Sequence, residues 1–269
     1  MRFAAIAAVA LAVSQPAFAW GLTGHRITGA VADEYLSPKA RAGVKDILGT
    51  ESLAEASNWP DFMRSDPDPF WQKESVPWHY VTIPADKAYA DVGHPPEGDS
   101  ITALTKYAAI ARDAKAPLAE RQKALRFVIH IVGDLSQPLH VGRPGDRGGN
   151  DVKVSFFGEQ TNLHTLWDST LIAHNQLSYT EWAGWLTSRF TTDELRDWSS
   201  PDPQQWLADS VLEREAMYPA NPDLRYSYVF EQQARLNRQL GKGGLRLASY
   251  LNALFDTPVA AAPQKKGRK

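Results

Sequence analysis

The sequence predicts a mainly α-helical protein whose helices form one folded domain. Apolar residues recur with helical periodicity along most of the 269 residues, whereas only one short segment alternates as a strand does. No linker divides residues 20–257, and no internal repeat of the solenoid type is present. A chain of this length can bury a hydrophobic core within a single domain, so we expect one helical domain over residues 20–257.

The first nineteen residues have the features of a secretory signal peptide. Arg2 supplies a positive charge, residues 4–13 form an apolar stretch too short to span a bilayer, and residues 17–19 read Ala-Phe-Ala, a small-x-small cleavage site. Cleavage there makes Trp20 the first residue of the mature chain. Because no other segment reaches transmembrane length, we expect a secreted or periplasmic protein without a transmembrane anchor.

The helices follow from apolar periodicity and from signals at their ends. Residues 23–36 and 38–48 are predicted as amphipathic helices, and residues 60–98, which are rich in Pro and Trp, as an irregular region. Six further segments are predicted as helices: 99–114, 118–136, 162–174, 179–189, 203–216 and 226–255. Asp99 or Ser100 is expected to cap the first of these six.

The remaining predicted features are a glycine-rich loop, a short strand, a break in the last helix and a C-terminal tail. The loop of residues 142–151 is rich in glycine, and residues 152–157 alternate as in a short strand. A glycine cluster predicts a break in the last helix at Gly241, Gly243 and Gly244. Beyond Pro258 the chain is small, polar and basic, so we expect residues 258–269 to form a disordered tail.

The charge balance argues against binding of nucleic acid through a broad basic face. The formal net charge is −2, and about −7 when the leader arginine and the four cationic tail residues are left out. Bound metal ions, whose charge this count omits, can still supply positive potential. The chain has no cysteine, so an exported form lacks disulfides and bound metal is one candidate source of rigidity.

Histidines beside carboxylates form the strongest chemical signal. His130 and Asp134 lie four residues apart on a predicted helix and are followed by His140, and His164 and Asp168 repeat this spacing on another helix. A single pair of this kind is more often a surface pair or a capped core histidine. Both pairs lie in apolar segments, however, and a buried aspartate has to be paired or bind a metal. Without cysteine, only His, Asp, Glu and chain termini remain as zinc ligands.

Motifs of Trp, His, Asp and Asn follow one another between residues 20 and 170. They are Trp20–His25 (WGLTGH), Asn58–Asp61 (NWPD), Trp78–Tyr80 (WHY), His130–His140 (HIVGDLSQPLH), Gly148–Asn150 (GGN) and Asn162–Asp168 (NLHTLWD). Each is modest alone, but in this order they resemble the S1/P1 nuclease family; the last third of the chain matches only as helices. The resemblance implies a helical fold of the S1/P1 nuclease and phospholipase C type with a small β-hairpin.

The resemblance also implies three zinc ions in one cleft. Carried over by position, the first ion would take Asp61, His79, His130 and Asp134. The second would take His140, His164 and Asp168. The third would take His25, Asp134 and the free amino group and carbonyl of Trp20, so that Asp134 bridges two ions. Since a backbone amine can bind zinc only as a free terminus, removal of residues 1–19 would complete the site.

The activity that the resemblance implies is hydrolysis of phosphodiester bonds in single-stranded DNA and RNA to 5′-phosphorylated products, with 3′-nucleotidase activity as a further expectation. The catalytic residues would be Asp61, Arg64 and Asp134, and Arg64 and Asn150 would bind substrate; the fork of an arginine suits phosphate oxygens. The expected partners are nucleic acids and nucleotides, and no stable protein partner is implied. Four aromatic residues are available to stack a base, namely Trp78, Tyr80, Phe156 and Phe157.

Some positions depart from the pattern of the family. Fungal and plant relatives have disulfides, and this chain has none. Thr82 stands where some relatives have an aspartate, so an auxiliary acidic role is not predicted there. His94 and His174 match no motif and are expected to be solvated or packed.

Two alternatives have different activities. A zinc-dependent phospholipase C is similar in fold and in its three-metal site, but its last ligand on the second helix is a glutamate where Asp168 stands here. Its first histidine also lies further from the N-terminal tryptophan than His25 does. A helical binding protein with purely structural zinc is the other alternative, and it would leave nucleic acids and 3′-nucleotides intact.

Overall fold

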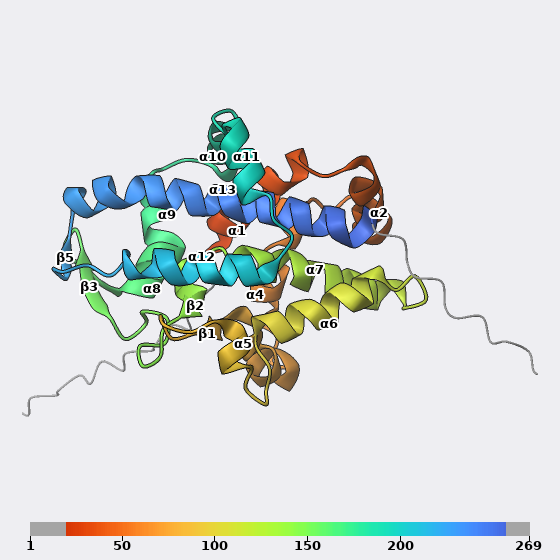
Figure 1. Ribbon diagram of the computed structural model, residues 1–269, viewed down its shortest axis with the longest axis horizontal. Coiled ribbons are helices and arrows are strands. Elements are labelled where there is room, and N and C mark those ends of the chain that lie inside the picture. Colours follow the sequence, from red (N-terminus) through yellow and green to blue (C-terminus); the bar gives the residue numbers. More distant parts are fainter. Residues whose placement is uncertain (1–19, 257–269) are drawn as a thin grey trace, which may run out of the picture.

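Helices cross one another over most of the molecule in the computed structural model, which describes residues 20–256 (Figure 1). The predicted signal peptide at residues 1–19 and the predicted tail at 258–269 lie outside the described residues. The prediction of a mainly α fold is confirmed. Within residues 20–256, no helix has the length and apolar character needed to cross a membrane.

The first long helices form where periodicity predicts them. They are α1 (Leu22–Glu34), α2 (Pro38–Leu48), α6 (Ser100–Arg112) and α7 (Leu118–Asp134). The side chain of Asp99 accepts hydrogen bonds from the backbone of Ile101 and Thr102, which confirms the predicted cap of α6. Pro38 opens α2, where a missing N–H costs nothing because that group has no partner within the helix.

The region rich in Pro and Trp consists of short elements. They are α3 (Leu53–Ala56), α4 (Trp59–Met63), a π turn η1 (Phe70–Glu74), a 3-10 turn η2 (Val76–His79), β1 (Val81–Thr82) and α5 (Tyr89–Val92). Aromatic rings hold these pieces against α7 and α6: the ring of Phe127 is stacked between those of Trp71 and Tyr107, with centroids 5.7 and 4.5 Å away. Tertiary packing, not helix propensity, therefore orders this region.

The predicted strand belongs to a small hairpin. β3 (Lys153–Phe156) pairs antiparallel with β4 (Glu159–Asn162), which confirms the hairpin. β5 (Asp223–Leu224) adds to β3 in parallel, and β1 pairs in parallel with β2 (Val141–Gly142). These two-residue strands carry no alternation and were not predicted from the sequence.

The second half returns to helices. A 3-10 turn η3 (Pro138–His140) follows α7, and after the hairpin a continuous helical stretch comprises α8 (Leu163–Thr165), a π turn η4 (Leu166–Thr170) and α9 (Leu171–His174). Then come α10 (Tyr179–Thr187), α11 (Thr192–Trp198), α12 (Pro203–Glu215) and α13 (Tyr226–Asp256). α11 was not predicted from the sequence.

The predicted break in the last helix is wrong, because α13 continues through all three glycines and spans the molecule as one helix (Figure 1). Their role is close packing. A Cβ on Gly244 would lie 2.3 Å from Val31 Cγ1, and one on Gly243 would lie 2.7 Å from Thr28 Cγ2, so α13 approaches α1 too closely for a side chain. α1 and α13 thus pack backbone to side chain at this crossing.

This packing predicts that Gly244→Ala lowers the free energy of unfolding by about 1–3 kcal/mol, because overpacking outweighs the helix propensity gained. Gly184→Ala in α10 is the matched control, since a Cβ there meets no atom of the described chain within 4 Å. It should raise the free energy of unfolding by about 0.5–1 kcal/mol. Urea unfolding measures the free energy of unfolding of both variants. A change of the same sign in both would contradict the close-packing explanation.

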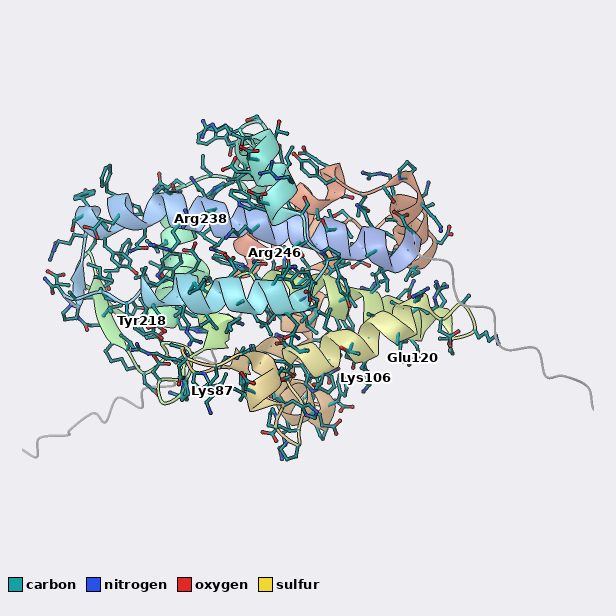
Figure 2. The ribbon with its side chains drawn as sticks, in the orientation of Figure 1. Lys87, Lys106, Glu120, Tyr218, Arg238 and Arg246 are labelled. Carbon is teal, nitrogen blue, oxygen red and sulfur yellow. The ribbon has the colours of Figure 1, made fainter. Side chains whose placement is uncertain are left out.

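Ion pairs join α12 to α13. Asp209 of α12 accepts hydrogen bonds from Lys242 and Arg246 of α13, each at 2.7 Å. Glu213 binds Arg238 one turn further along; Figure 2 labels Arg238 and Arg246 on α13. The two cations that meet Asp209 are buried, so each requires this carboxylate as a partner. Arg214 of α12 also donates to the carbonyls of Ile83 and Val141, which places α12 beside β2.

Candidate metal centre

The last two turns of α7 lie inside the protein and carry polar side chains. Every residue of α7 from Phe127 to Asp134 is buried. His130 and Asp134 project from the same face, with His130 Nε2 3.2 Å from Asp134 Oδ2. The spacing of four residues thus has the geometric consequence that the sequence predicts.

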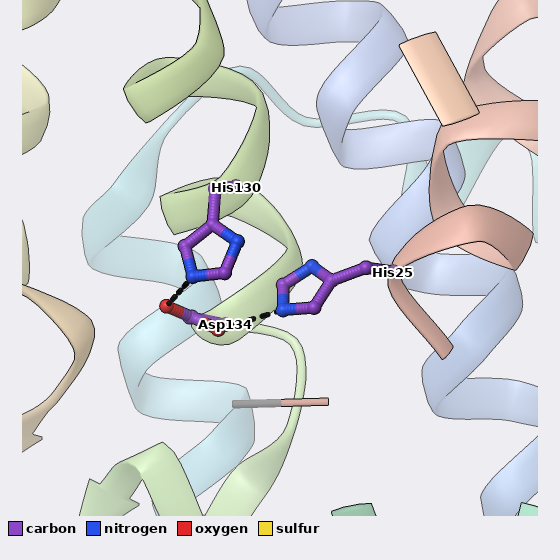
Figure 3. A group of neighbouring side chains, drawn as sticks. All are labelled: His25, His130 and Asp134. Carbon is purple, nitrogen blue, oxygen red and sulfur yellow. Dashed lines mark ion pairs between the residues drawn. The ribbon is translucent and has the colours of Figure 1, made fainter. Parts of the chain in front are cut away.

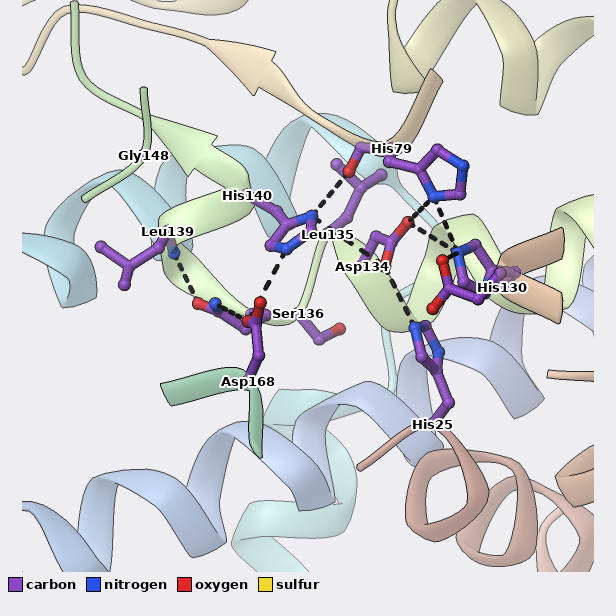
Figure 4. Close-up of polar contacts among 12 residues, drawn as sticks. His25, His79, His130, Asp134, Leu135, Ser136, Leu139, His140, Gly148 and Asp168 are labelled. Atoms are coloured by element: carbon purple, nitrogen blue, oxygen red, sulfur yellow. Dashed lines mark hydrogen bonds and ion pairs between the residues drawn. The ribbon is translucent and has the colours of Figure 1, made fainter. Parts of the chain in front are cut away.

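Three other segments bring side chains to Asp134. His25 of α1 places Nε2 3.3 Å from Asp134 Oδ1, and its ring stacks on that of His130 with centroids 4.1 Å apart (Figure 3). His79 of η2 places Nδ1 3.2 Å from Asp134 Oδ2 and 2.8 Å from His130 Nε2 (Figure 4). Asp61 of α4 approaches with Oδ1 3.9 Å from His130 Nε2.

A second group lies next to the first. His164 and Asp168 come from α8 and η4, with His164 Nε2 3.0 Å from Asp168 Oδ2. His140 of η3 completes the group, with Nε2 3.8 Å from Asp168 Oδ1 and Nδ1 4.0 Å from Asp134 Oδ1 (Figure 4). His140 therefore stands between the two groups, which form one continuous buried cluster.

Backbone carbonyls orient three of the histidine rings. The Nδ1–H groups of His130, His140 and His164 donate to the carbonyls of Ser57, His79 and Gly148, each at 2.7 Å. A carbonyl accepts but never donates, so these bonds leave the Nε2 lone pairs facing the cluster. Gly148 has φ +62°, and a Cβ there would lie 2.4 Å from the carbonyl oxygen of Leu139, so only glycine brings its carbonyl to His164.

Several buried atoms of the cluster lack hydrogen-bond partners within the described part of the chain. They include His25 Nδ1, His140 Nε2 and both carboxylate oxygens of Asp61. Burial of so many unpaired polar atoms is costly unless a ligand satisfies them. Three groups have ligand atoms within 4.8 Å of one another: His25, His130 and Asp134; Asp61, His79 and His130; and His140, His164 and Asp168. Imidazole nitrogens and carboxylate oxygens without thiols fit a divalent metal such as zinc.

The histidines of the cluster differ in the direction of their pKa shifts. Burial lowers the pKa of His25 and of His79, which keeps these rings in the neutral form that binds metal. Burial alone would raise the pKa of Asp134, but His130 and the other neighbouring imidazoles hold it well below its ordinary value. Burial also opposes a proton on His140, yet the carboxylates of Asp168 and Asp134 outweigh it and raise the pKa of His140 to about 9.

This shift predicts that metal binding releases protons near neutral pH. Protonation of His140 stabilises the metal-free protein. This stabilisation is fully present at pH values below 6.5, the ordinary pKa of histidine, and is lost as the pH rises through about 9. Over the same range the affinity for zinc should increase, because the proton no longer competes for Nε2. Calorimetry at pH 7.5 in two buffers of different ionisation enthalpy measures the released protons, and identical heats in both buffers would contradict the prediction.

The chain start is anchored beside the cluster. Trp20 is buried, and the N–H of Gly21 donates to the carbonyl of Asp168 at 2.7 Å. A Cβ on Gly21 would lie 2.1 Å from Ser169 Oγ, so the backbone passes directly against η4. The residue predicted as the mature N-terminus thus lies next to Asp168 and five residues before His25.

A pocket of about 360 Å³ opens onto the cluster. Its wall includes His79, His140 and His164, together with Arg64 and Asn150 from the predicted substrate-binding set. Arg64 places Nη1 3.8 Å from Asp61 Oδ1. The side-chain amide of Asn150 donates to the carbonyl of Arg147 at 2.9 Å, an interaction within its own loop.

The four candidate stacking residues differ in whether they line the pocket or pack inside the protein. Tyr80 lines the pocket and is 45% exposed. Trp78 packs against Tyr107 and Phe127, and Phe156 is buried in the second hydrophobic cluster. Phe157 stacks on the ring of His174, which is an exposed residue. Tyr80 is the one of these four that faces the pocket.

Gln137 is a site residue that sequence reasoning missed. It is buried, its Nε2 donates to Asp168 Oδ1 at 2.5 Å, and its Oε1 accepts from the N–H of Leu139 at 2.7 Å. It therefore fixes both the carboxylate of Asp168 and the turn that carries His140. The signal was available, because a glutamine between His130 and His140 in an apolar segment needs buried partners.

The largest pocket described, about 550 Å³, lies elsewhere, between α10, α11 and α13. Trp185, Phe190 and Trp198 line it, along with Arg189 and Arg238. None of the three His/Asp groups found in residues 20–256 contributes to it. The chemistry therefore points to the smaller pocket.

Comparison with known proteins agrees with the geometry. The sequence model of the family described as S1/P1 Nuclease matches residues 20–256. Nuclease S1 of Aspergillus oryzae is 28% identical over 291 aligned residues, which cover 96% of this chain and 99% of the relative. Nuclease P1 of Penicillium citrinum is 29% identical, with 90% and 100% covered, and Endonuclease 2 of Arabidopsis thaliana is 28% identical, with 88% and 90% covered.

Proposed function

The chain belongs to the S1/P1 nuclease family and is a hydrolase of phosphodiester bonds, and from this premise we propose that it is a zinc-dependent endonuclease of single-stranded DNA and RNA. Its products carry 5′-phosphates, and 3′-nucleotides are a further substrate class. The observation that carries the proposal is a buried cluster of His and Asp side chains with unpaired atoms, which opens onto a pocket lined by Arg64.

Nine residues are proposed to hold three zinc ions. One ion takes Asp61, His79, His130 and Asp134; a second takes His140, His164 and Asp168; the third takes His25, Asp134 and the backbone amine and carbonyl of Trp20. The short distances from Asp134 to His25, His79 and His130 support its bridging position. Zinc, when bound, lowers the pKa of a coordinated water and neutralises phosphate charge.

The protein's own groups act on the substrate around these ions. Arg64 presents a guanidinium at the pocket wall beside Asp61, where its fork can bind two phosphate oxygens and stabilise the charge that develops in the transition state. Asp61 and Asp134 are the other catalytic residues proposed, since both carboxylates project into the cluster. Asn150 contacts the substrate from the glycine-rich loop.

The dimensions of the pocket support a preference for single strands. A pocket of about 360 Å³ can admit one unstacked nucleotide, whereas a base within a duplex would first have to leave its stack. Tyr80 offers an exposed ring on which any base can stack, which gives affinity without sequence preference.

Export is part of the same proposal. We infer that residues 1–19 direct secretion or periplasmic export and are then removed, which frees the amine of Trp20. The mature catalytic domain comprises residues 20–257. No stable protein partner is needed, because every proposed ligand comes from this one chain.

One experiment separates this function from its alternatives. The mature protein is purified, its metal content is measured, and it is assayed on denatured DNA, RNA, a 3′-nucleotide and phosphatidylcholine. We expect about three zinc ions per chain and 5′-phosphorylated fragments from both nucleic acids. Hydrolysis of phosphatidylcholine alone would support the phospholipase alternative, and full zinc content without hydrolysis of any substrate would support a structural role for the metal.

A further inference from the structure

Arg147 lies in the pocket wall, but the sequence motifs gave it no role. It belongs to the glycine-rich loop of residues 142–151 and lines the pocket together with Gly148 and Asn150. Its side chain is 75% exposed, whereas that of Arg64 is 16% exposed. Arg64 therefore lies deep in the pocket beside Asp61, and Arg147 lies at the rim.

The backbone at Arg147 adopts a conformation that arginine rarely takes. Its φ is +52°, in the left-handed region that favours glycine, although glycines follow at positions 148 and 149. A residue held in this region requires surroundings that fix it, and such residues cluster at functional sites. The loop thus presents an arginine where a glycine would fit the backbone better.

Asp146 supplies the fixing contacts. It is largely buried; Oδ1 accepts from the N–H of Gly149 at 3.2 Å, and Oδ2 accepts from the hydroxyl of Tyr218 at 2.6 Å and from Arg143 Nε at 2.9 Å. Tyr218 follows α12, so the loop is held from outside the site (Figure 2). The guanidinium of Arg143 also lies over the Tyr218 ring, 3.6 Å from its centroid. The residues on either side of Arg147 are therefore anchored while its side chain remains at the surface.

The partner of Arg147 is readily exchanged. Its guanidinium forms a fork with Asp151, with Nη2 2.7 Å from Oδ1 and Nε 3.1 Å from Oδ2. Asp151 is 46% exposed, and ion pairs at such exposed sites stabilise a fold very little. A phosphate offers the same two-oxygen geometry as this carboxylate. The pair therefore keeps Arg147 extended along the rim in a form that suits phosphate binding.

We propose that Arg147 binds a phosphate of the substrate strand next to the linkage that is hydrolysed, and so favours oligonucleotides over dinucleotides. The nuclease function proposed above supplies the ligand class, a polyanionic strand with phosphates on both sides of the reacting one. Arg64 occupies the deep position beside Asp61, so the rim arginine meets a phosphate further along the strand. Asp151 competes for Arg147 until that phosphate arrives.

Binding of uncleavable strands tests the proposal without relying on turnover. The probes are a thymidine hexanucleotide and a dinucleotide whose 3′ oxygens at each linkage are replaced by methylene groups, which keeps the charge. Binding to the zinc-loaded mature protein is followed by fluorescence anisotropy at several salt concentrations. The variants are Arg147→Gln, Arg147→Lys, Asp151→Asn and the double variant Arg147→Gln/Asp151→Asn. Arg196→Gln is the control, because Arg196 is an exposed arginine of α11 that also pairs with aspartates, Asp193 and Asp197.

We expect Arg147→Gln to raise the Kd of the hexanucleotide roughly 5- to 20-fold and that of the dinucleotide less than twofold. The slope of log Kd against log salt concentration for the hexanucleotide (the salt slope) should fall by about 0.7, the value for one lost phosphate contact on a single strand. Arg147→Lys should restore the slope but only part of the affinity. Asp151→Asn should tighten hexanucleotide binding about two- to fivefold, and this gain should disappear in the double variant.

Equal effects of Arg147→Gln on both probes, or no effect on either, would overturn the proposal, and so would an unchanged salt slope. Cleavage of natural single-stranded DNA by the wild-type protein is measured in parallel. Cleavage together with binding that does not depend on Arg147 refutes the inference and leaves the nuclease function standing. Binding that depends on Arg147 without any cleavage supports the inference and refutes the nuclease function.

Discussion

Asp134→Asn is expected to remove zinc from the protein and to lower kcat/KM on single-stranded DNA by on the order of 10³-fold or more. The carboxylate of Asp134 lies within 3.3 Å of nitrogen atoms of His25, His79 and His130, so two of the three proposed zinc sites depend on it. Asparagine has the same shape, which preserves packing, but it lacks the negative charge and one ligand oxygen. The loss should therefore exceed that caused by a residue that binds a single ion.

Metal analysis and steady-state kinetics on the same preparation measure this effect. Asp193→Asn is the control, because Asp193 is an exposed aspartate of α11 whose side chain is 77% exposed. It should retain both zinc and activity. Full zinc content in Asp134→Asn, or activity within tenfold of the wild type, would show that Asp134 does not bridge two ions.

An extension of two residues, Gly-Ser, before Trp20 is expected to lower activity on the order of 10²-fold and to reduce bound zinc from three ions to two. An amide nitrogen within a peptide bond has no lone pair for zinc, whereas a free amine has one. Trp20 is buried and the N–H of Gly21 is bonded to the carbonyl of Asp168, so the chain start cannot move away to make room. The third ion would lose its amine ligand from Trp20 while the other two sites stay intact.

Rescue by proteolysis distinguishes a ligand role from simple obstruction of folding. A protease site placed immediately before Trp20 allows the extension to be removed from the folded protein. Activity and the third zinc ion should return after cleavage. The same two residues added at the C-terminus should change neither property. An extended protein with three zinc ions and full activity would refute the role of the Trp20 amine.

The helices with strong apolar periodicity could be predicted from the sequence, and those set by tertiary contacts could not. α6 and α7 begin and end within two residues of their predictions, because caps and periodicity are local signals. The pairing of β1 with β2 depends on segments about sixty residues apart, which no local pattern reports. The glycines of α13 misled the prediction, since they pack against residues outside α13: Gly241 against Phe190 and Trp198, and Gly243 and Gly244 against α1.

The members of the candidate site could be named from the sequence, but not their mode of contact. Every side chain assigned as a metal ligand is buried, and those ligands fall into three adjacent groups. The sequence could not reveal that His79 presents Nδ1 while His130, His140 and His164 present Nε2, because carbonyls from distant segments set these orientations. Gln137 and Arg147 escaped notice for the same reason: their roles depend on partners and a backbone angle that appear only in the fold.

Anomalous scattering at the zinc absorption edge, from crystals of the mature protein, tests the central claim most directly. Three zinc peaks are expected within the cluster: one beside Asp61 and His79, one beside His140 and His164, and one between His25 and the amine of Trp20. Fewer than three peaks in crystals grown with excess zinc, or peaks bound by other residues, would contradict it.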